Sequence, residues 1–254
     1  MADKVTYLVG QGKLYAAERD EATGLPLENF KWLGNVPALA IALNTDAITH
    51  TESYTGNRLQ DLVLDGAKTA SATITMEQFD RDSLELALYG KSAVTTAPTA
   101  VTDEPVTFHK GAYTFLKYGS LTAGPTITFG TGTPVAGIDY IVNQKDGSIF
   151  VPFSSAIADG ATAQVDYSYG AVETVGAFAS NSRYHILRFQ GMNQASSYKS
   201  VTVEIFRAKL MPTSSLPLIN NEVAQFEVMA QLLLDPLRQY DSTEGAFFSI
   251  KTAL

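Results

Sequence analysis

The feature that most constrains this chain is a long alternation of apolar and polar residues near its C-terminal end. Between Glu222 and Leu234, one parity of the sequence is apolar throughout. Its members are Ala224, Phe226, Val228, Ala230, Leu232 and Leu234. Successive side chains of a strand point to opposite faces, so the pattern predicts a strand with one buried and one solvated face. Because a typical strand has about five or six residues, we expect this one to cross a large sheet.

Two more strands are predicted directly before it, over Tyr184–Phe189 and over Ser200–Lys209. A fourth alternation, with small side chains, predicts a strand over Thr69–Phe79. These segments organise a mainly β fold, and the polar side chains of the C-terminal strands would form a wet face that includes Glu204 and Glu227 and is flanked by Glu222.

Composition excludes several classes of chemistry. The chain has 254 residues and no cysteine, so disulfides, zinc–thiolate sites, iron–sulfur ligation and cysteine nucleophiles are ruled out. Its 18 Lys and Arg against 26 Asp and Glu give a net charge of −8, which disfavours binding to nucleic-acid phosphates. The longest apolar run, Val36–Leu43, is far below the ~20 residues of a membrane-spanning helix. Since the start of the chain shows no secretory signal, we expect a soluble protein made in the cytoplasm.

The first part of the chain predicts a succession of hairpins. Short strands over Val5–Val9 and Lys13–Glu18 flank a Gly10-Gln11-Gly12 turn. Trp32 is interpreted as a core or interface anchor. The polar stretch from Asp46, through a turn at Thr55-Gly56-Asn57-Arg58, to Gly66 predicts a long hairpin that projects from the domain. A solvated surface loop is the alternative for this stretch.

One helix is expected, with Asp80 as its N-cap and Gly90 as its stop. Its apolar stripe would be Leu84, Ala87 and Leu88. Ser92–Pro105 is interpreted as a linker or a long connection. Residues 105–176, rich in Gly, Thr and Tyr, predict a small inserted β-domain of short strands, with a hairpin turn at Asp146-Gly147. Residues 1–104 and 177–254 would form the main domain.

No catalytic, cofactor-binding or metal-binding constellation is found in the sequence. His50, His109 and His185 are scattered, and His185 is interpreted as a satisfied structural histidine in a strand. The chain has no nucleophile elbow, calcium loop or complete phosphate-binding loop. We therefore predict no enzyme and no cofactor, although paired glycosidase carboxylates would leave no local signature.

The order of these segments resembles the major tail tube protein of long-tailed, siphovirus-like bacteriophages. The likeness rests on the polar hairpin Ile48–Asn57, the strand Thr69–Phe79 with its helix ending at Gly90, the block Tyr184–Asn193, and the stretch from Val201 to Asp235. The insert, with its Gly137-Ile138-Asp139-Tyr140 and Val165-Asp166-Tyr167 patterns, is similar to the β-domains that decorate virion proteins.

The resemblance implies a β-sandwich tail-tube fold of two roughly orthogonal sheets with one flanking helix. It also implies homohexameric rings that stack into a tube through which DNA passes without specific binding. Partners would be further copies, the tape measure, the tail terminator and the distal tail protein, in the virion tail. The hairpin residues expected to stack rings are His50, Thr51, Glu52, Ser53, Tyr54, Asn57 and Arg58. The acids expected to face the lumen are Glu204, Glu222 and Glu227, and the insert would lie outside the tube.

Two other classes stay open. One is the inner tube of a contractile injection system, which has no need for the insert. The other is an adhesion or binding module of a virion or cell surface that uses the Tyr-rich surface of the insert.

Overall fold

The computed structural model describes residues 7–96, 98–130, 134–238 and 245–253, and these are mainly β. Residues Val5 and Thr6 of the first predicted strand lie outside them. The chain divides into two compact units, unit 1 (1–91 and 175–254) and unit 2 (92–174).

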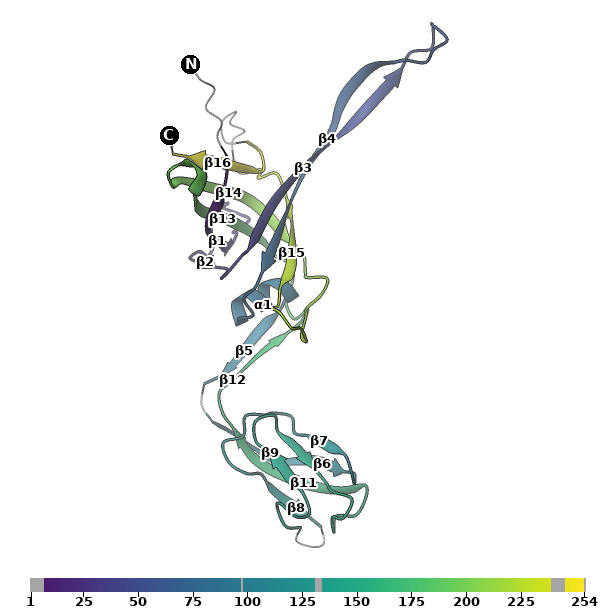
Figure 1. The fold of residues 1–254 in the computed structure, drawn as a ribbon, viewed down its shortest axis with the longest axis vertical. Coiled ribbons are helices and arrows are strands. Elements are labelled where there is room, and N and C mark those ends of the chain that lie inside the picture. Colours follow the sequence, from purple (N-terminus) through teal and green to yellow (C-terminus); the bar gives the residue numbers. More distant parts are fainter. Residues whose placement is uncertain (1–6, 97, 131–133, 239–244, 254) are drawn as a thin grey trace. The chain divides into compact units, whose positions relative to one another are not determined.

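Unit 1 is built on a single eight-stranded sheet in the order β2-β1-β13-β14-β15-β4-β3, with β16 also paired to β14 (Figure 1). Its elements are β1 (Gly10–Glu18), β2 (Lys31–Trp32), β3 (Ala38–Thr51), β4 (Gln60–Met76), α1 (Arg81–Leu88), β13 (Tyr184–Asn193), the 3₁₀-helix η1 (Gln194–Ser196), β14 (Lys199–Leu210), β15 (Phe226–Leu232) and β16 (Phe248–Thr252).

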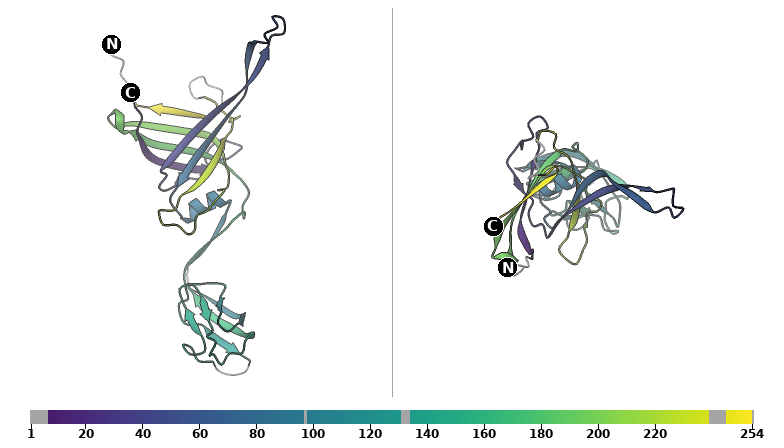
Figure 2. Two further views of the ribbon diagram at one scale, coloured as in Figure 1. Left: turned by 45° about the vertical axis from the view of Figure 1, so that its right-hand side comes forward. Right: turned by 90° about the horizontal axis from the view of Figure 1, so that it is seen from above.

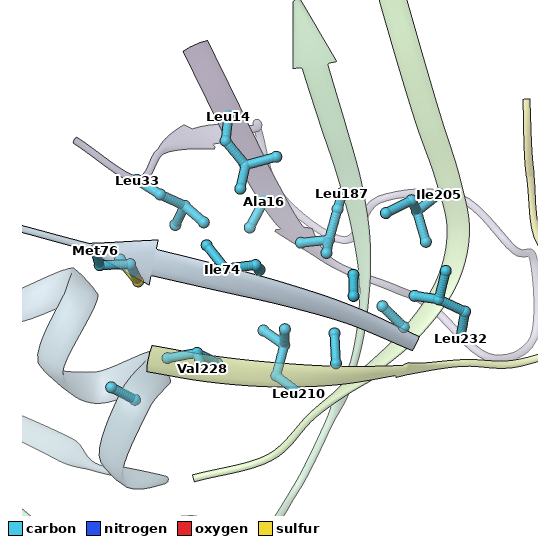
Figure 3. Close-up of a cluster of buried hydrophobic side chains, with 14 of the residues drawn as sticks. Leu14, Ala16, Leu33, Ile74, Met76, Leu187, Ile205, Leu210, Val228 and Leu232 are labelled. Atoms are coloured by element: carbon cyan, nitrogen blue, oxygen red, sulfur yellow. The ribbon is translucent and has the colours of Figure 1, made fainter. Parts of the chain in front are cut away.

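Strand β14 makes the sheet curl. Its first half pairs with β16, from Val201 to Ile205, and its last residues, Ala208 to Leu210, pair with β15. A bulge lies between these halves, where two residues of β14 oppose one residue of β13. Side chains from both halves therefore meet in one apolar cluster, drawn in Figure 3. Its fully buried members include Leu14, Ile74, Leu187, Ile205, Leu210 and Val228.

The predicted C-terminal strand is shorter than expected. Phe226, Val228, Ala230 and Leu232 are buried as the alternation predicts. Residues 222–225 and Leu234 lie outside the strand, and Leu234 is exposed. The ladder with β4 ends at Leu232, and the amide of Leu233 donates to the carbonyl of Arg207 in β14.

The predicted N-terminal hairpin is wrong. Gly10 to Gly12 lie inside β1, where Gly12 is directly opposite Gly191 of β13. A Cβ atom on Gly12 would lie 2.4 Å from the carbonyl oxygen of Gln190 and 2.8 Å from the Phe189 ring. Gly12 and Gly191 therefore permit a close approach of the two backbones beside the Phe189 ring, and Gly10-Gln11-Gly12 forms no turn.

The helix and its Asp80 N-cap agree with the prediction, but the left-handed C-cap is Tyr89 and not Gly90, and the buried face differs. The Asp80 side chain accepts from the Ser83 amide, and Tyr89 ends α1 in the left-handed region. The buried residues are Ser83 and Ala87, and Leu86 packs against the core, whereas Leu84 and Leu88 are only partly buried. Trp32, expected as a core or interface anchor, is 51% exposed, so it is no core residue.

Unit 2 holds two three-stranded sheets that share a second apolar cluster. Its strands are β6 (Thr99–Phe108), β7 (Tyr113–Phe115), β8 (Thr126–Phe129), β9 (Ile141–Asn143), β10 (Ser148–Phe150) and β11 (Ala161–Tyr169). A two-stranded sheet joins β5 (Lys91–Thr95) to β12 (Val172–Gly176). The predicted turn at Asp146-Gly147 is present, with Gly147 at a φ of 70° and the Asp146 side chain accepting from the Ser148 amide.

The predicted linker Ser92–Pro105 is wrong, since most of it belongs to β5 and β6. The second unit accordingly begins at Ser92, whereas the sequence placed its start at 105. Pro105 lies opposite Gln164 in β6, an edge strand of its sheet, where a missing amide hydrogen is tolerated.

The paired glycines give a test of the fold. Gly12→Ala should destabilise the chain by about 1–3 kcal/mol, because the new methyl group would overlap the backbone of β13. The measurement is chemical denaturation of the full chain. Gly10→Ala is the control, since nothing lies within 4 Å of a Cβ at that position. Equal stabilities for the two variants would contradict the close-approach explanation.

Candidate self-assembly surfaces

A long hairpin, here called the arm, extends β3 and β4 beyond the rest of unit 1 (Figures 1 and 2). β15 pairs with β4 only between Ala70 and Met76, whereas the β3–β4 ladder continues to Thr51 and Gln60. The arm, residues 44–69, is thus a two-stranded ribbon. The hairpin prediction is confirmed, and the alternative of an irregular loop is wrong. An isolated two-stranded ribbon is marginally stable in water, so the arm depends on the continuation of β3 and β4 into the sheet of unit 1.

Aliphatic side chains of the arm are exposed. Ile48 pairs with Leu64, and His50 pairs with Leu62, so Ile48, Leu62 and Leu64 share one face of the ribbon. Each of the three is about half exposed or more. A cluster of branched apolar side chains on a projecting ribbon is typical of a protein interaction surface.

The tip of the arm, Glu52–Leu59, is organised by Glu52. This carboxylate is buried, accepts from the amides of Tyr54 and Thr55 at 2.8 Å and from the amide of Leu59 at 3.2 Å, and also binds the Thr55 hydroxyl. The Thr55 hydroxyl and then the backbone amides hold the pKa of Glu52 at about 2, below its ordinary 4.5, although burial opposes them. Glu52 therefore closes the tip from inside.

The other hairpin residues expected to stack rings lie at or near the tip. His50 and Thr51 end β3, and the His50 ring lies 2.6 Å from the Asp61 carboxylate. Of the remaining expected residues, all four are exposed at the tip: Ser53, Tyr54, Asn57 and Arg58. Arg58 has a φ of 51°, and within the described residues its guanidinium makes no ion pair.

The three acids expected to face a lumen lie in three different settings. Glu227 is exposed on β15, in a row with Thr75 and Ala38. Glu204 is on β14, directly opposite Arg188, and lies 3.9 Å from Arg238. Glu222 lies in the segment before β15, so the strand parity that suggested its orientation does not apply.

The two outward faces of the curled sheet differ in charge. Away from the core, β15, β4 and β3 present the rows Glu227–Thr75–Ala38, Met229–Thr73–Ala40 and Gln231–Ser71–Ala42. We call this the small-residue face, and Glu227 is the single charge in these rows. On the basic face, formed by β1, β13, β14 and β16, Lys13, Arg188 and Lys251 accompany Glu204.

A buried ion pair between Arg19 and Asp235 was not indicated by the sequence. Arg19 donates to Asp235 at 2.6 Å, with 0% and 3% of their side chains exposed, and also to Glu21. Glu21 in turn binds Arg207. The pair joins residues 216 positions apart, so local sequence held no signal for it. It fastens the segment after β15 to the turn after β1.

A cavity of about 590 Å³ lies in unit 1 between α1 and the ends of β1 and β13. Its lining mixes the acids Glu18, Glu28, Asp82 and Glu85 with the cations Lys31, Lys91 and Arg183, and Glu18 is bound to Arg183. His185 also lines it. Burial lowers the pKa of His185, and its Nδ1 atom is buried without a hydrogen-bond partner in the described structure. The prediction of a satisfied histidine is therefore wrong for that nitrogen.

Over the described ranges, no group of three His, Cys, Asp or Glu side chains could hold a metal ion. The same ranges contain no helix with the length and apolar character needed to span a bilayer. In comparisons with known proteins, a family model described as "Protein of unknown function UCP028589" matches residues 7–251. No curated protein matches the chain.

The arm tip should loosen at low pH. Because the folded-state pKa of Glu52 lies below the unfolded value, its stabilising effect is complete above about pH 4.5 and is lost as the pH falls toward 2. Glu52→Gln should produce the same loosening at neutral pH. Hydrogen exchange at the amides of Tyr54, Thr55 and Leu59 would measure it. Asp61→Asn is the control, and unchanged exchange in Glu52→Gln would refute the role of Glu52.

Proposed function

The chain belongs to the family described as protein of unknown function UCP028589, and since that description assigns no activity, we propose from the arm and the fold that it is a major tail tube protein of a long-tailed bacteriophage. Its copies would form homohexameric rings that stack into a tube, and DNA would pass through the tube on ejection. Partners would be further copies, the tape measure, the tail terminator and the distal tail protein. The protein would be made in the host cytoplasm and would reside in the virion tail.

The observation that carries this proposal is the arm. It continues β3 and β4 past the last strand that supports them and exposes Ile48, Leu62 and Leu64 on one face. An exposed strand edge favours unwanted pairing with other chains, so a monomeric protein would gain stability by covering it. Contact with further copies would cover both the aliphatic side chains and the edge.

The small-residue face suits the channel wall. Cationic side chains hold phosphates through counterion release, so a wall that DNA must slide past should carry few of them. The small-residue face presents Glu227 and otherwise uncharged side chains, whereas the basic face presents three cations beside Glu204. On this proposal Glu227 faces the lumen, and Glu204 does not.

A binding module is the second candidate, favoured by one observation in unit 2. Tyr113, Phe150 and Ile141 form a row across β7, β10 and β9, and the rings of Tyr113 and Phe150 lie 4.8 Å apart. Tyr113 and Ile141 are more than half exposed. The inner tube of a contractile injection system would also assemble through the arm and the sheet. Finding the protein in a contractile or a non-contractile particle would distinguish this alternative from the main proposal.

Self-assembly is the first test. Purified chain at high concentration should form rings or tubes visible by electron microscopy. Replacing Glu52–Leu59 with an Asn-Gly turn should abolish stacking and leave the monomer folded, because the tip contributes no residue to either apolar core. Circular dichroism and thermal denaturation would check the fold. A wild-type chain that remains monomeric at high concentration would favour the binding module and count against the tube.

The channel wall is the second test. Glu227→Lys should leave tube formation intact, because the side chain is exposed, and should slow DNA release from assembled particles by adding a cation to the wall. The control is Glu173→Lys, the same charge change at an exposed position of unit 2. DNA release at the wild-type rate in Glu227→Lys particles would show that this face does not line the channel.

A further inference from the structure

The segment between β14 and β15, here called the docking loop (211–225), is held in place although it has no regular secondary structure. The Met211 amide donates to the Met229 carbonyl at 2.7 Å, and the Thr213 amide donates to the Ala87 carbonyl at 2.8 Å. Leu216 packs against the core of unit 1. At the far end, the Gln225 side chain donates to Glu77 at 2.7 Å. The loop is therefore ordered before any partner arrives, which reduces the entropy cost of binding.

Between these anchors the docking loop presents apolar side chains to solvent. Leu218 is 80% exposed, Ile219 is 99% exposed and Val223 is 71% exposed. Nothing in unit 1 packs on them, so they contribute little to the stability of the isolated chain. Adjacent exposed aliphatic side chains on a fixed loop are typical of a protein-binding surface.

The docking loop and the arm tip lie at opposite ends of unit 1. Its hydrogen bonds to Glu77 and Ala87 place the loop beside α1, just past the Met76 end of β4. The arm tip is at the Gln60 end of the same strand, and the 17 residues of β4 span about 55 Å at ~3.3 Å per residue. Figure 1 shows the same arrangement, with the tip and the olive loop beside α1 at the two ends of the unit. The two surfaces can therefore meet only between copies.

The two surfaces are complementary. The tip exposes Tyr54 and Leu59 together with Arg58, and the docking loop exposes Leu218 and Ile219 together with Glu222. Arg58 and Glu222 make no ion pair within the described residues. Each surface thus pairs exposed apolar side chains with one unpaired charge, and the two charges are opposite in sign.

We propose that the arm tip of one copy docks on the docking loop of a second copy, with Arg58 paired to Glu222 and the aliphatic side chains packed around them. The inference rests on the proposed function, since it identifies which surface of the neighbour receives the arm. Such a contact is heterologous, because it joins two different patches, so each copy offers one patch at each end and the contact can repeat along a stack. Glu222 then lies between copies and not in the lumen.

A charge exchange tests the pairing. Arg58→Glu and Glu222→Arg should each raise the protein concentration needed for assembly by about tenfold, because each brings like charges together at the contact. The double variant should return that concentration to near the wild-type value, since every contact again joins opposite charges. Sedimentation velocity and electron microscopy would measure assembly, and circular dichroism would check that each variant folds.

Two controls repeat the charge changes elsewhere. Lys145→Glu and Glu173→Arg alter exposed residues of unit 2 and should assemble as the wild type does. A second variant, Leu218→Ser with Ile219→Ser, probes the apolar part of the contact and should block assembly without unfolding, because both side chains are exposed in the monomer.

The outcomes separate the two proposals. Wild-type assembly by all the charge variants, or failure of the double variant to recover, would overturn the Arg58–Glu222 contact and leave the tube function standing. A wild-type chain that never assembles would overturn both.

Discussion

The bulge in β14 is the constraint on which unit 1 depends. Before it, Ile205 points into the core, and after it, Ala208 and Leu210 do, so the inward positions change parity at Phe206 and Arg207. Without the extra residue, the part of β14 that pairs with β15 would point Ala208 and Leu210 away from the core, because a one-residue shift moves every side chain to the opposite face. The bulge thus lets one strand bind β16 with its first half and β15 with its last, and it closes the sheet around a single core.

The same bulge sets the chemistry of the outward surface. Phe206 is forced away from the core and is buried under the Arg238 guanidinium, which lies 3.6 Å from its ring, while Arg207 stacks at 4.1 Å on Tyr184. Arg19 and Asp235 then hold the covering segments in place. Arg19, Arg207 and Arg238 thus belong to the packing around the bulge. They are distinct from Lys13, Arg188 and Lys251, the cations of the basic face.

Features encoded in neighbouring residues could be predicted from the sequence, and features that depend on a distant partner could not. The alternation from Phe226 to Leu232, the Asp80 cap and the Asp146-Gly147 turn are local, and the structure confirms them. The arm was predicted from its polar strands and turn residues. The role of Gly12 depends on its close contact with Gly191 on another strand, so the sequence around Gly12 did not reveal it. Glu222 was wrongly included in the C-terminal strand because the start of that strand is set by pairing with β4. The closing of the tip by Glu52 and the Arg19–Asp235 pair were missed because both depend on the folded path of the backbone.

The arm leaves branched apolar side chains exposed in the isolated chain. Its two strands pair with each other across two register shifts, but a two-stranded ribbon exposes both faces, and here one face carries Ile48, Leu62 and Leu64. Burying those side chains within the chain would require the arm to fold back onto unit 1, which would break the continuous β4 that runs from the tip into the core. A neighbouring copy can cover them without that cost. The strand that carries Ile74 and Met76 in the core also carries the arm, so on the proposed function the monomer fold would set the distance and direction at which the next copy is met.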